Sequence, residues 1–283
     1  MAIELCGVSK RFGDTRAVDG VSLTLAENTI YGLLGNNGAG KSTLLNLITG
    51  RLLPDSGTIT LDGTPVAEHD GALGQLFLVG ENNLFPAEMR VKRAFGVTAR
   101  FYPTFNIMYA LSLAEKFGLD VKKKITALST GYGSIFRLIL ALSVNTPYVF
   151  LDEPVLGLDA QHRDLFYQLL LEKYLEHPCT IVISTHLIQE VAALIAHTVI
   201  LRDGKILRDC PADALSDAVT VSGPAAAVDS YVAGRDILST RTLGGLKSVC
   251  IQGAAGDLPE GLEQAPVGLQ EYFIALMEQE VRV

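Results

Sequence analysis

The sequence predicts an α/β fold with a parallel core sheet, an N-terminal antiparallel β subdomain, a helical subdomain insertion and a small C-terminal accessory region. Two observations support this prediction. Short apolar runs, such as Tyr148–Leu151 and Thr180–Ser184, alternate with stretches of helical periodicity, as in a sheet that helices cover on both faces. The apolar run Thr29–Leu34 leads into a glycine-rich loop, and the helical pattern Lys41–Thr49 follows until Gly50 stops it.

The antiparallel subdomain is predicted from three runs near the start of the chain, Ile3–Val8, Val18–Leu25 and Thr58–Leu61. Turn residues, including Gly13-Asp14 and Asp62-Gly63, separate or follow these runs. Short apolar runs bounded by such turns are typical of strands that pair in antiparallel fashion. We therefore expect a small antiparallel sheet beside the parallel one.

The helical insertion is predicted from about Phe85 to Leu128, where helix formers and aromatic residues are frequent. A further helix is expected through Ser134–Leu142, so the helical subdomain covers about residues 85–145. The next predicted helix, Gln161–Tyr174, lies between the two buried strands named above.

The accessory region is predicted from the last part of the chain. The turn Asp203-Gly204 joins two short strands, and a Gly/Ala/Pro-rich stretch at Ser222–Ala227 is expected to be a boundary. From Asp209 to Val283, acids outnumber bases eleven to four. Leu269–Met277 has the pattern of a terminal helix.

Composition excludes several classes of protein. With 283 residues, of which 48% are hydrophobic, the chain is expected to bury a substantial core. The net charge of −8 argues against non-specific nucleic-acid binding, which depends on Lys and Arg neutralising phosphates. The most apolar run, Ile135–Val144, is interrupted by Arg137 and is shorter than the ~20 residues of a membrane span. Any membrane role is therefore expected to act through a partner.

A phosphate-binding loop follows the strand Thr29–Leu34. Its residues are Gly35, Asn36, Asn37, Gly38, Ala39, Gly40, Lys41 and Ser42, which match the pattern G-x-x-x-x-G-K-[ST]. Glycines let backbone N–H groups surround the phosphates of ATP, and the next helix points its positive end at them. We expect Lys41 to reach the β- and γ-phosphates, Ser42 to bind Mg²⁺, and Thr43 to join the nucleotide-binding residues.

Two carboxylates end the second buried strand, in the segment Tyr148–Pro154. Ligands bind at the carboxyl ends of strands in open α/β sheets. Asp152 is therefore predicted to hold Mg²⁺, and Glu153 to polarise an attacking water. Alone, an Asp-Glu pair after a strand is more often only a solvated turn; beside the phosphate loop, it indicates ATP hydrolysis.

Together with Leu128-Ser129-Thr130-Gly131-Tyr132, these motifs resemble the nucleotide-binding subunit of an ABC transporter. The resemblance covers about Met1–Leu215 and implies a P-loop NTPase fold, an ABC ATPase domain at 1–215 and an accessory region at 216–283. The family's motif L-S-G-G-Q departs here at Thr130 and Tyr132. Ser129 and Gly131 are kept, and the resemblance implies that they face the γ-phosphate. We expect the departures to retune hydrolysis, not to abolish it.

The resemblance assigns three further residues. Asp159, in Gly157-Leu158-Asp159, corresponds to the D-loop that communicates across a dimer, although a helix N-cap explains the same residue. His186, after the strand Thr180–Ser184, matches the switch histidine that contacts the γ-phosphate. Phe12 occupies the position that stacks on adenine, and core packing is the competing interpretation.

The clearest departure from the family is its Q-loop, where a glutamine contacts Mg²⁺ and relays the nucleotide state to the membrane subunit. The position falls on Gly80 or Glu81 in this chain. Mg²⁺ prefers oxygen donors, so Glu81 is a candidate metal ligand that would add negative charge to the site.

The family's mode of action implies several partners. Two copies, or one copy and a related ATPase subunit, would close head to tail around ATP and Mg²⁺ and drive a separate transmembrane permease from the cytoplasmic face of the membrane. The stretches Phe101–Lys124 and Leu128–Ile135 most resemble bacterial subunits associated with GntR-type regulators and with export of antibiotics or peptides. Transport specificity resides in the permease, so the sequence does not identify the transported substrate.

Three other functions are compatible with a phosphate-binding loop. A soluble ABC ATPase acting on DNA or ribosomes would favour tandem cassettes, a long coiled coil or a basic face, and the sequence reveals none. A GTPase or small-molecule kinase would share only the phosphate loop, and the chain has no Asn-Lys-x-Asp guanine motif. A nucleotide-gated regulatory module with weak hydrolysis stays open, because only an activity measurement separates it from a transporter motor.

Overall fold

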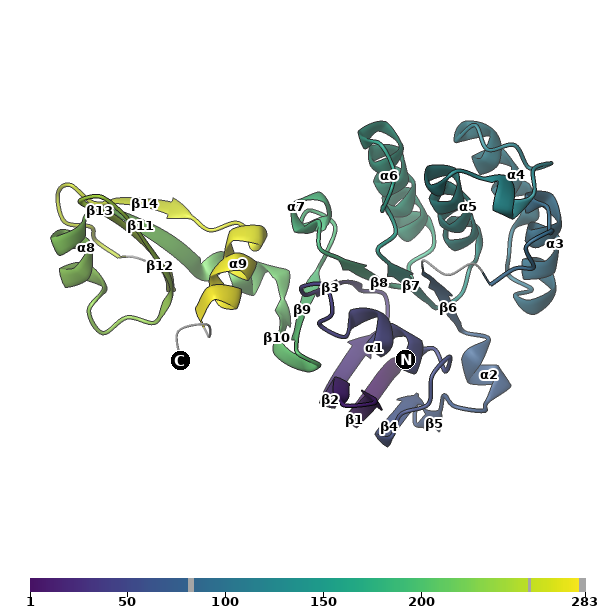
Figure 1. The fold of residues 1–283 in the computed structure, drawn as a ribbon, viewed down its shortest axis with the longest axis horizontal. Coiled ribbons are helices and arrows are strands. Elements are labelled where there is room, and N and C mark those ends of the chain that lie inside the picture. Colours follow the sequence, from purple (N-terminus) through teal and green to yellow (C-terminus); the bar gives the residue numbers. More distant parts are fainter. Residues whose placement is uncertain (81–83, 254–255, 280–283) are drawn as a thin grey trace. The chain divides into compact units, whose positions relative to one another are not determined.

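Two compact units make up the chain in a computed structural model, shown in Figure 1. The structure describes residues 1–80, 84–253 and 256–279. The first unit comprises Met1–His186 and Val199–Asp209, and the second comprises Leu187–Thr198 and Cys210–Val283. The domain boundary expected between residues 215 and 216, and the extent of the helical subdomain, stay predictions.

The predicted antiparallel sheet is confirmed. Its strands, in the spatial order β2-β1-β4-β5, are β1 (Ala2–Phe12), β2 (Thr15–Ala26), β4 (Ser56–Leu61) and β5 (Thr64–Pro65). Alternation along β1 buries Ile3 and Leu5, and a register shift before Val8 keeps that side chain buried as well. One face of this sheet is therefore apolar.

The core sheet has the strand order β10-β9-β3-β8-β7-β6. Its strands are β3 (Ile30–Leu34), β6 (Leu76–Val79), β7 (Tyr148–Asp152), β8 (Thr180–Thr185), β9 (His197–Arg202) and β10 (Lys205–Pro211). The pairs β3–β8, β8–β7 and β7–β6 are parallel, and every residue of β3, β7 and β8 is buried. Continuous burial is expected where helices cover both faces of a parallel sheet.

Strand β6 was missed at the sequence level. Its signal is the four-residue apolar run Leu-Phe-Leu-Val immediately before Gly80. A run this short is too weak to separate a buried strand from a helix or a loop by periodicity. Its pairing with β7 decides the assignment.

Helix α1 (Lys41–Ile48) lies between the two sheets (Figure 1). Leu44 and Leu45 have no exposed surface and share one core with side chains of β1 and β7. Burying a leucine side chain contributes roughly 1.5–3 kcal/mol. The helix that follows the phosphate loop is therefore fixed on both sides by apolar packing.

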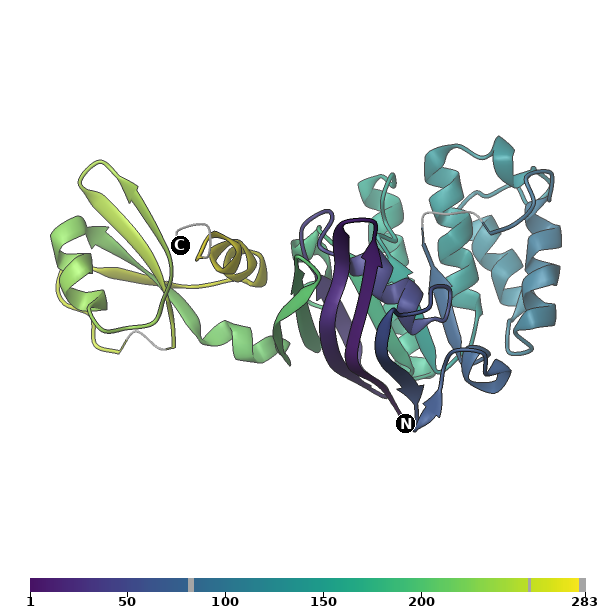
Figure 2. The same cartoon turned by 60° about the horizontal axis from the view of Figure 1, so that its bottom comes forward.

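The predicted helical segment contains α3 (Val91–Phe101), α4 (Ile107–Lys116), a short 3₁₀ turn (Ile125–Ala127) and α5 (Thr130–Ser143). Buried aromatic rings hold these helices together. The centroid of Phe95 lies 6.0 Å from that of Phe136 and 6.1 Å from that of Phe105. Viewed from a second direction, the three helices gather on the side of the parallel sheet where α6 also lies (Figure 2).

Helix α6 (Ala160–Glu176) carries a buried lysine that caps α5. The Lys173 ammonium donates to the carbonyl oxygens of Leu142, at 3.0 Å, and of Val144, and to Oδ1 of Asn145 at 3.1 Å. These are acceptors at the end of α5, where carbonyl groups lack partners within the helix. Burial lowers the pKa of Lys173 from 10.5 to about 8.

The second unit contains a four-stranded antiparallel sheet and helices that pack on it. The strand order is β12-β13-β11-β14, from β11 (Ala218–Pro224), β12 (Ile237–Leu243), β13 (Leu246–Gln252) and β14 (Glu263–Pro266). Helix α8 (Ala225–Val232) packs on β11 and β13 through Val228 and Val232. The predicted terminal helix is confirmed as α9 (Leu269–Gln279).

One local expectation in this region is wrong. Ser222–Ala227 does not form a boundary, because it ends β11 and begins α8. Pro224 occupies the N-cap of α8, where a missing N–H costs little, and the three alanines that follow are strong helix formers. The Gly/Ala/Pro composition therefore marks a strand-to-helix turn.

The remaining helices are short: α2 (Asp70–Leu73), α7 (Ile188–Val191) and a 3₁₀ helix at Ala212–Asp217. None of the helices within the described ranges is long and apolar enough to cross a membrane.

The buried Lys173 gives a pH-dependent contribution to stability. Between about pH 7 and about pH 9.5 the unfolded state holds more protons at this residue than the folded state does, so the free energy of unfolding rises with pH by about 2 kcal/mol. Lys173→Met removes this contribution. We expect the stability difference between the parent and Lys173→Met, measured by urea unfolding, to shift by that amount in favour of the parent. A difference that does not change across this range would contradict the depressed pKa.

Candidate functional site

The phosphate loop connects β3 to α1 as the sequence predicts. Gly40 has φ of 104°, and a Cβ there would lie 2.1 Å from the carbonyl oxygen of Ala17. Gly38 also has a positive φ, of 82°, but has open space around it. Only glycine fits at position 40, because the positive φ disfavours any side chain and the Ala17 carbonyl oxygen occupies the space of a Cβ. The packing of β2 against the loop therefore sets the loop's shape.

Lys41 lies beneath this loop and is 6% exposed. Its Nζ donates to the carbonyl oxygens of Gly35, at 2.7 Å, and Asn36, at 3.3 Å. An ammonium group has three donors, so one is left for a phosphate oxygen. The exposed residues Asn36, Asn37, Gly38 and Ser42 and the half-buried Thr43 surround the position where phosphates would bind, while Ala39 is buried.

Glu153 links the loop to two neighbouring strands. Its φ of 46° is unusual for a residue with a side chain, and its N–H donates to the carbonyl oxygen of Ser184 at 2.9 Å. The carboxylate lies 3.7 Å from Lys41 Nζ through Oε1 and 2.9 Å from His186 Nδ1 through Oε2. The structure thus brings together the three residues predicted to be catalytic. Ser184 was not among the predicted residues, because its contribution comes from its main chain and leaves no sequence signal.

Asp152 supplies an unpaired carboxylate oxygen beside this group. The residue is 9% exposed, and its Oδ1 is buried without a hydrogen-bond partner among the described residues. A buried anionic oxygen without a partner is costly, and a cation removes that cost. No cluster of three or more His, Cys, Asp or Glu that would enclose a metal occurs among the described residues. This donor set fits Mg²⁺, which is commonly held by one or two protein oxygens together with phosphates and water.

Gly80, one of the two candidates for the Q-loop position, lies next to Asp152. A Cβ on Gly80 would lie 3.8 Å from Cβ and 4.0 Å from Oδ2 of Asp152. Glu81, the predicted metal ligand, lies outside the described residues. Its role therefore stays a prediction, and the absence of a side chain at position 80 leaves space beside the Asp152 carboxylate.

Ser129, Gly131 and Asp159 lie at the beginnings of two helices. Ser129 accepts a hydrogen bond from the N–H of Tyr132 at 3.4 Å, and Asp159 accepts one from the N–H of His162 at 2.9 Å. Both side chains are thus N-caps, the alternative already considered for Asp159. The hydrogen bonds from His162 also hold the pKa of Asp159 below its usual value. A Cβ on Gly131 would lie 3.0 Å from the carbonyl oxygen of Gly157, so the first turn of α5 is in close contact with the segment that precedes α6.

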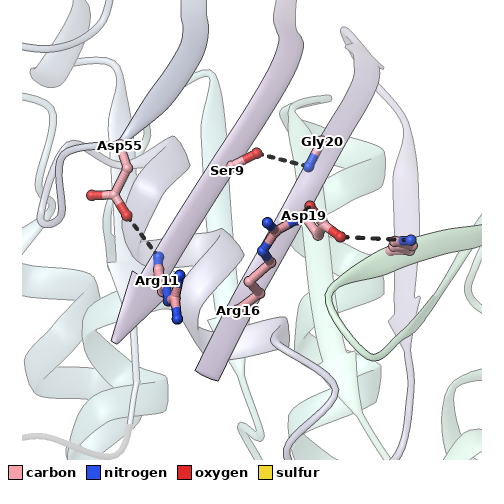
Figure 3. A network of polar contacts seen from close by, with 7 residues as sticks. Ser9, Arg11, Arg16, Asp19, Gly20 and Asp55 are labelled. Carbon is pink, nitrogen blue, oxygen red and sulfur yellow. Dashed lines mark hydrogen bonds and ion pairs between the residues drawn. The ribbon is translucent and has the colours of Figure 1, made fainter. Parts of the chain in front are cut away.

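Phe12 is 49% exposed at the end of β1, which is inconsistent with core packing. Its ring centroid lies 5.8 Å from Lys10 Nζ. Figure 3 shows two polar contacts that fix this hairpin: Asp55 accepts from the N–H of Arg11 at 2.7 Å, and Ser9 Oγ accepts from the N–H of Gly20 at 2.9 Å. Asp19 also pairs with Arg16. Asp55 and Lys10 were not identified from the sequence, because their pairing joins distant segments. An exposed aromatic ring on a fixed hairpin is suited to stacking on a base.

An apolar groove of about 640 Å³ lies beyond Gly80. Aromatic residues of several elements line it, including Phe77, Phe85, Phe101, Tyr102 and Phe136. Leu84 is 65% exposed and Phe101 76% exposed, unusually high fractions for large apolar side chains. Arg51, whose pKa burial lowers, donates to the carbonyl oxygen of Leu78 at 2.6 Å in the same groove.

Comparisons with known proteins show which family the chain resembles. A family model described as ABC transporter matches residues 18–156. The ABC transporter ATP-binding protein YtrB of Bacillus subtilis is 31% identical over 215 residues, covering 76% of this chain and 74% of YtrB. A Nod factor export ATP-binding protein I of Burkholderia lata is 35% identical over 242 residues, covering 78% and 77% of the two chains. A ribose import ATP-binding protein, RbsA of Pseudomonas putida, is 32% identical, and the aligned part covers 42% of it.

Solved structures support the fold. An ATP-binding subunit of an ABC transporter has a TM-score of 0.68 at 22% identity, with 76% of this chain and 92% of that chain covered. A dimeric post-hydrolysis state of an ATP-binding cassette, bound to ADP and Pi, has a TM-score of 0.65 at 23% identity, with 74% and 98% covered.

The loop geometry predicts that two glycines differ in their tolerance of a methyl group. Gly40→Ala forces a Cβ to within 2.1 Å of the Ala17 oxygen and is expected to lower the free energy of unfolding by about 3 kcal/mol or more. Gly38→Ala, which meets no atom within 4 Å, should cost only about 1–2 kcal/mol. Urea unfolding of both variants measures the difference. Equal costs would mean that contact with β2 does not constrain the loop.

Proposed function

The chain belongs to the ABC transporter family of ATP-binding proteins, and on this premise we propose that it is the motor subunit driving a separate membrane permease. ATP binding and ATPase activity are properties of this family and accord with the fold. The observation that carries the proposal is the meeting of Lys41, Glu153 and His186 beneath the phosphate loop.

The geometry suggests a role for each group. The third donor of Lys41 would bind a phosphate oxygen, and Glu153 would take a proton from the attacking water. His186, whose Nδ1 lies 2.9 Å from the other carboxylate oxygen, would orient Glu153 and place its ring beside the γ-phosphate. Ser42 and Asp152 would hold Mg²⁺, which neutralises phosphate charge during transfer. The strained backbone at Glu153 is consistent with a positioned catalytic group.

Dimerisation would complete the site. Ser129, Thr130 and Tyr132 are exposed at the N-terminal end of α5, whose backbone N–H groups favour an anion. In the proposed dimer, this end of one subunit faces the ATP held by the phosphate loop of the other. Asp159, exposed beside Gly157, would lie along the same interface. The second subunit is either another copy or a related ATPase subunit.

The permease would dock on the apolar groove that begins at Gly80. Exposed Leu84 and Phe101 give the groove the apolar surface expected of a protein contact. Gly80 lies beside Asp152, so a change at the nucleotide would reach the groove through one short segment. The subunit would then lie at the cytoplasmic face of the membrane, held by its permease.

Export is the proposed direction of transport. The Nod factor export proteins match this chain over most of their own length, 77% for that of Burkholderia lata, whereas the ribose import protein matches over 42%. Subunits associated with GntR-type regulators and with antibiotic or peptide export remain the proposed subgroup.

A second candidate is a nucleotide-gated regulatory module with weak hydrolysis. The specific observation in its favour is Gly80, one of the two candidates for the glutamine position, which puts no side chain next to Asp152. Turnover by the purified chain distinguishes this module from a motor.

The motor proposal predicts separate effects on hydrolysis and dimerisation. Glu153→Gln removes the proton acceptor and is expected to lower steady-state ATP hydrolysis by about 10²-fold or more, with ATP still bound. In ATP and Mg²⁺ the variant should accumulate as a dimer in size-exclusion chromatography, and chelation of Mg²⁺ should return it to monomers. Glu172→Gln, an exposed carboxylate on α6, is the matched control and should behave as the parent does.

Two results would contradict the motor proposal. Hydrolysis by Glu153→Gln at the parental rate would remove the assigned catalytic role. A folded parent that binds ATP without turnover, alone and with its permease, would favour the regulatory module.

A further inference from the structure

Charge is distributed very unevenly along this chain. Between Phe85 and Leu128 there are eight Lys and Arg residues and three Asp and Glu residues, a net charge of +5. The rest of the chain has 15 bases and 28 acids, a net charge of −13. The helical segment is therefore a cationic part of an anionic protein. Charged residues that served only to keep the surface solvated would not need to gather in one segment.

The fold concentrates these bases into one patch. Met89–Lys92 runs beside Val121–Ile125: the N–H of Val91 donates to the carbonyl oxygen of Lys123 at 3.1 Å, and that of Lys92 donates to the carbonyl oxygen of Val121 at 2.9 Å. A β-bridge joins Arg90 to Lys124. We call the resulting surface the basic patch; it comprises Arg90, Lys92, Arg93, Lys122, Lys123 and Lys124. The sequence-based expectation of no basic face is thus wrong, because the two segments are about thirty residues apart in the chain.

The basic patch is available to an external partner. All six side chains are exposed. Within the described ranges, the ion pair of Lys124 with Glu88 is the one carboxylate contact made by these six residues. Asp120 accepts a hydrogen bond from the main-chain N–H of Lys122 at 2.9 Å. Five of the six positive charges therefore have no carboxylate partner within the part of the chain that the structure describes.

The patch adjoins the apolar groove. Met89 lines the groove, and the next residue, Arg90, belongs to the patch. Under the proposed function, on which this step rests, the groove receives a permease segment emerging from the bilayer. A surface continuous with the groove then lies close to lipid headgroups.

We propose that the basic patch binds the anionic lipid headgroups of the membrane around the permease. Phosphate groups on a planar surface attract clustered Lys and Arg, each changing partition about fivefold. Attraction acts within a Debye length of about 8–10 Å, so only the part of the protein facing the membrane contributes strongly. A long nucleic acid would extend beyond the patch, and the anionic rest of the chain would repel its phosphates. The groove therefore orients the ATPase on its permease, and the patch strengthens its hold on the membrane.

Vesicle binding by the full-length chain tests this inference. Phosphatidylcholine vesicles with about 30 mol% phosphatidylglycerol should retain the protein in co-sedimentation at about 50 mM salt, and pure phosphatidylcholine vesicles should not. Raising the salt to about 500 mM should release it, because the Debye length shortens. Lys122→Glu with Lys123→Glu should weaken partition by about 25-fold or more without changing ATP hydrolysis.

A matched control separates the patch from net charge. Lys205→Glu with Arg208→Glu makes the same change in net charge at two exposed residues of β10 and should leave vesicle binding unchanged. Equal loss in both double variants, or no preference for anionic vesicles, would overturn the inference. So would salt-sensitive binding to duplex DNA or RNA in place of vesicles. Each of these results would overturn lipid binding without changing the outcome of the ATPase and dimerisation tests. Conversely, a loss of turnover in those tests would contradict the motor proposal and would not alter the vesicle measurement.

Discussion

Parallel pairing of β3, β8 and β7 is the constraint on which the site depends. Leu34 lies opposite Thr185, and Asp152 lies opposite Ser184, so three loops begin at one edge of the sheet. The first loop binds phosphate, the second carries the two carboxylates, and the third carries His186. Since the strands are buried on both faces, packing fixes their register. A fixed register also fixes the positions at which the three loops begin. Lys41 and Glu153, which are more than a hundred positions apart in the chain, therefore lie within ion-pair distance of each other, at 3.7 Å.

Polar groups at this edge are held in a costly state that a nucleotide and a metal would relieve. Lys41 is buried against carbonyl oxygens, Asp152 has a buried oxygen without a partner among the described residues, and Glu153 adopts a left-handed backbone conformation. Such features usually reduce stability, and proteins retain them where function requires them. The apolar packing of α1 between two sheets offsets the cost of these polar groups.

The helical segment combines two surfaces of different chemistry. The groove is apolar and aromatic, which suits a tightly packed protein segment, while the basic patch is charged and exposed, which suits a hydrated anionic surface. Gly80 connects the groove to the nucleotide site through its contact with Asp152. Under the proposed function, one part of the chain would thus sense the nucleotide and contact both the permease and the lipid that surrounds it.

The sequence by itself determined the parts whose signals are local. The phosphate loop, Asp152 and Glu153 after a buried strand, and the antiparallel sheet near the start all follow from spacing and periodicity. Tertiary structure alone decided which distant groups meet: the main chain of Ser184 fixes Glu153, Ala17 makes Gly40 obligatory, β7 turns the short run Leu76–Val79 into a strand, and Arg90 lies beside Lys124. These pairings depend on backbone contacts between segments far apart in the chain, and a backbone group is the same whichever side chain it carries. Sequence patterns report side chains along one segment, so they do not reveal contacts that the backbone makes across the fold.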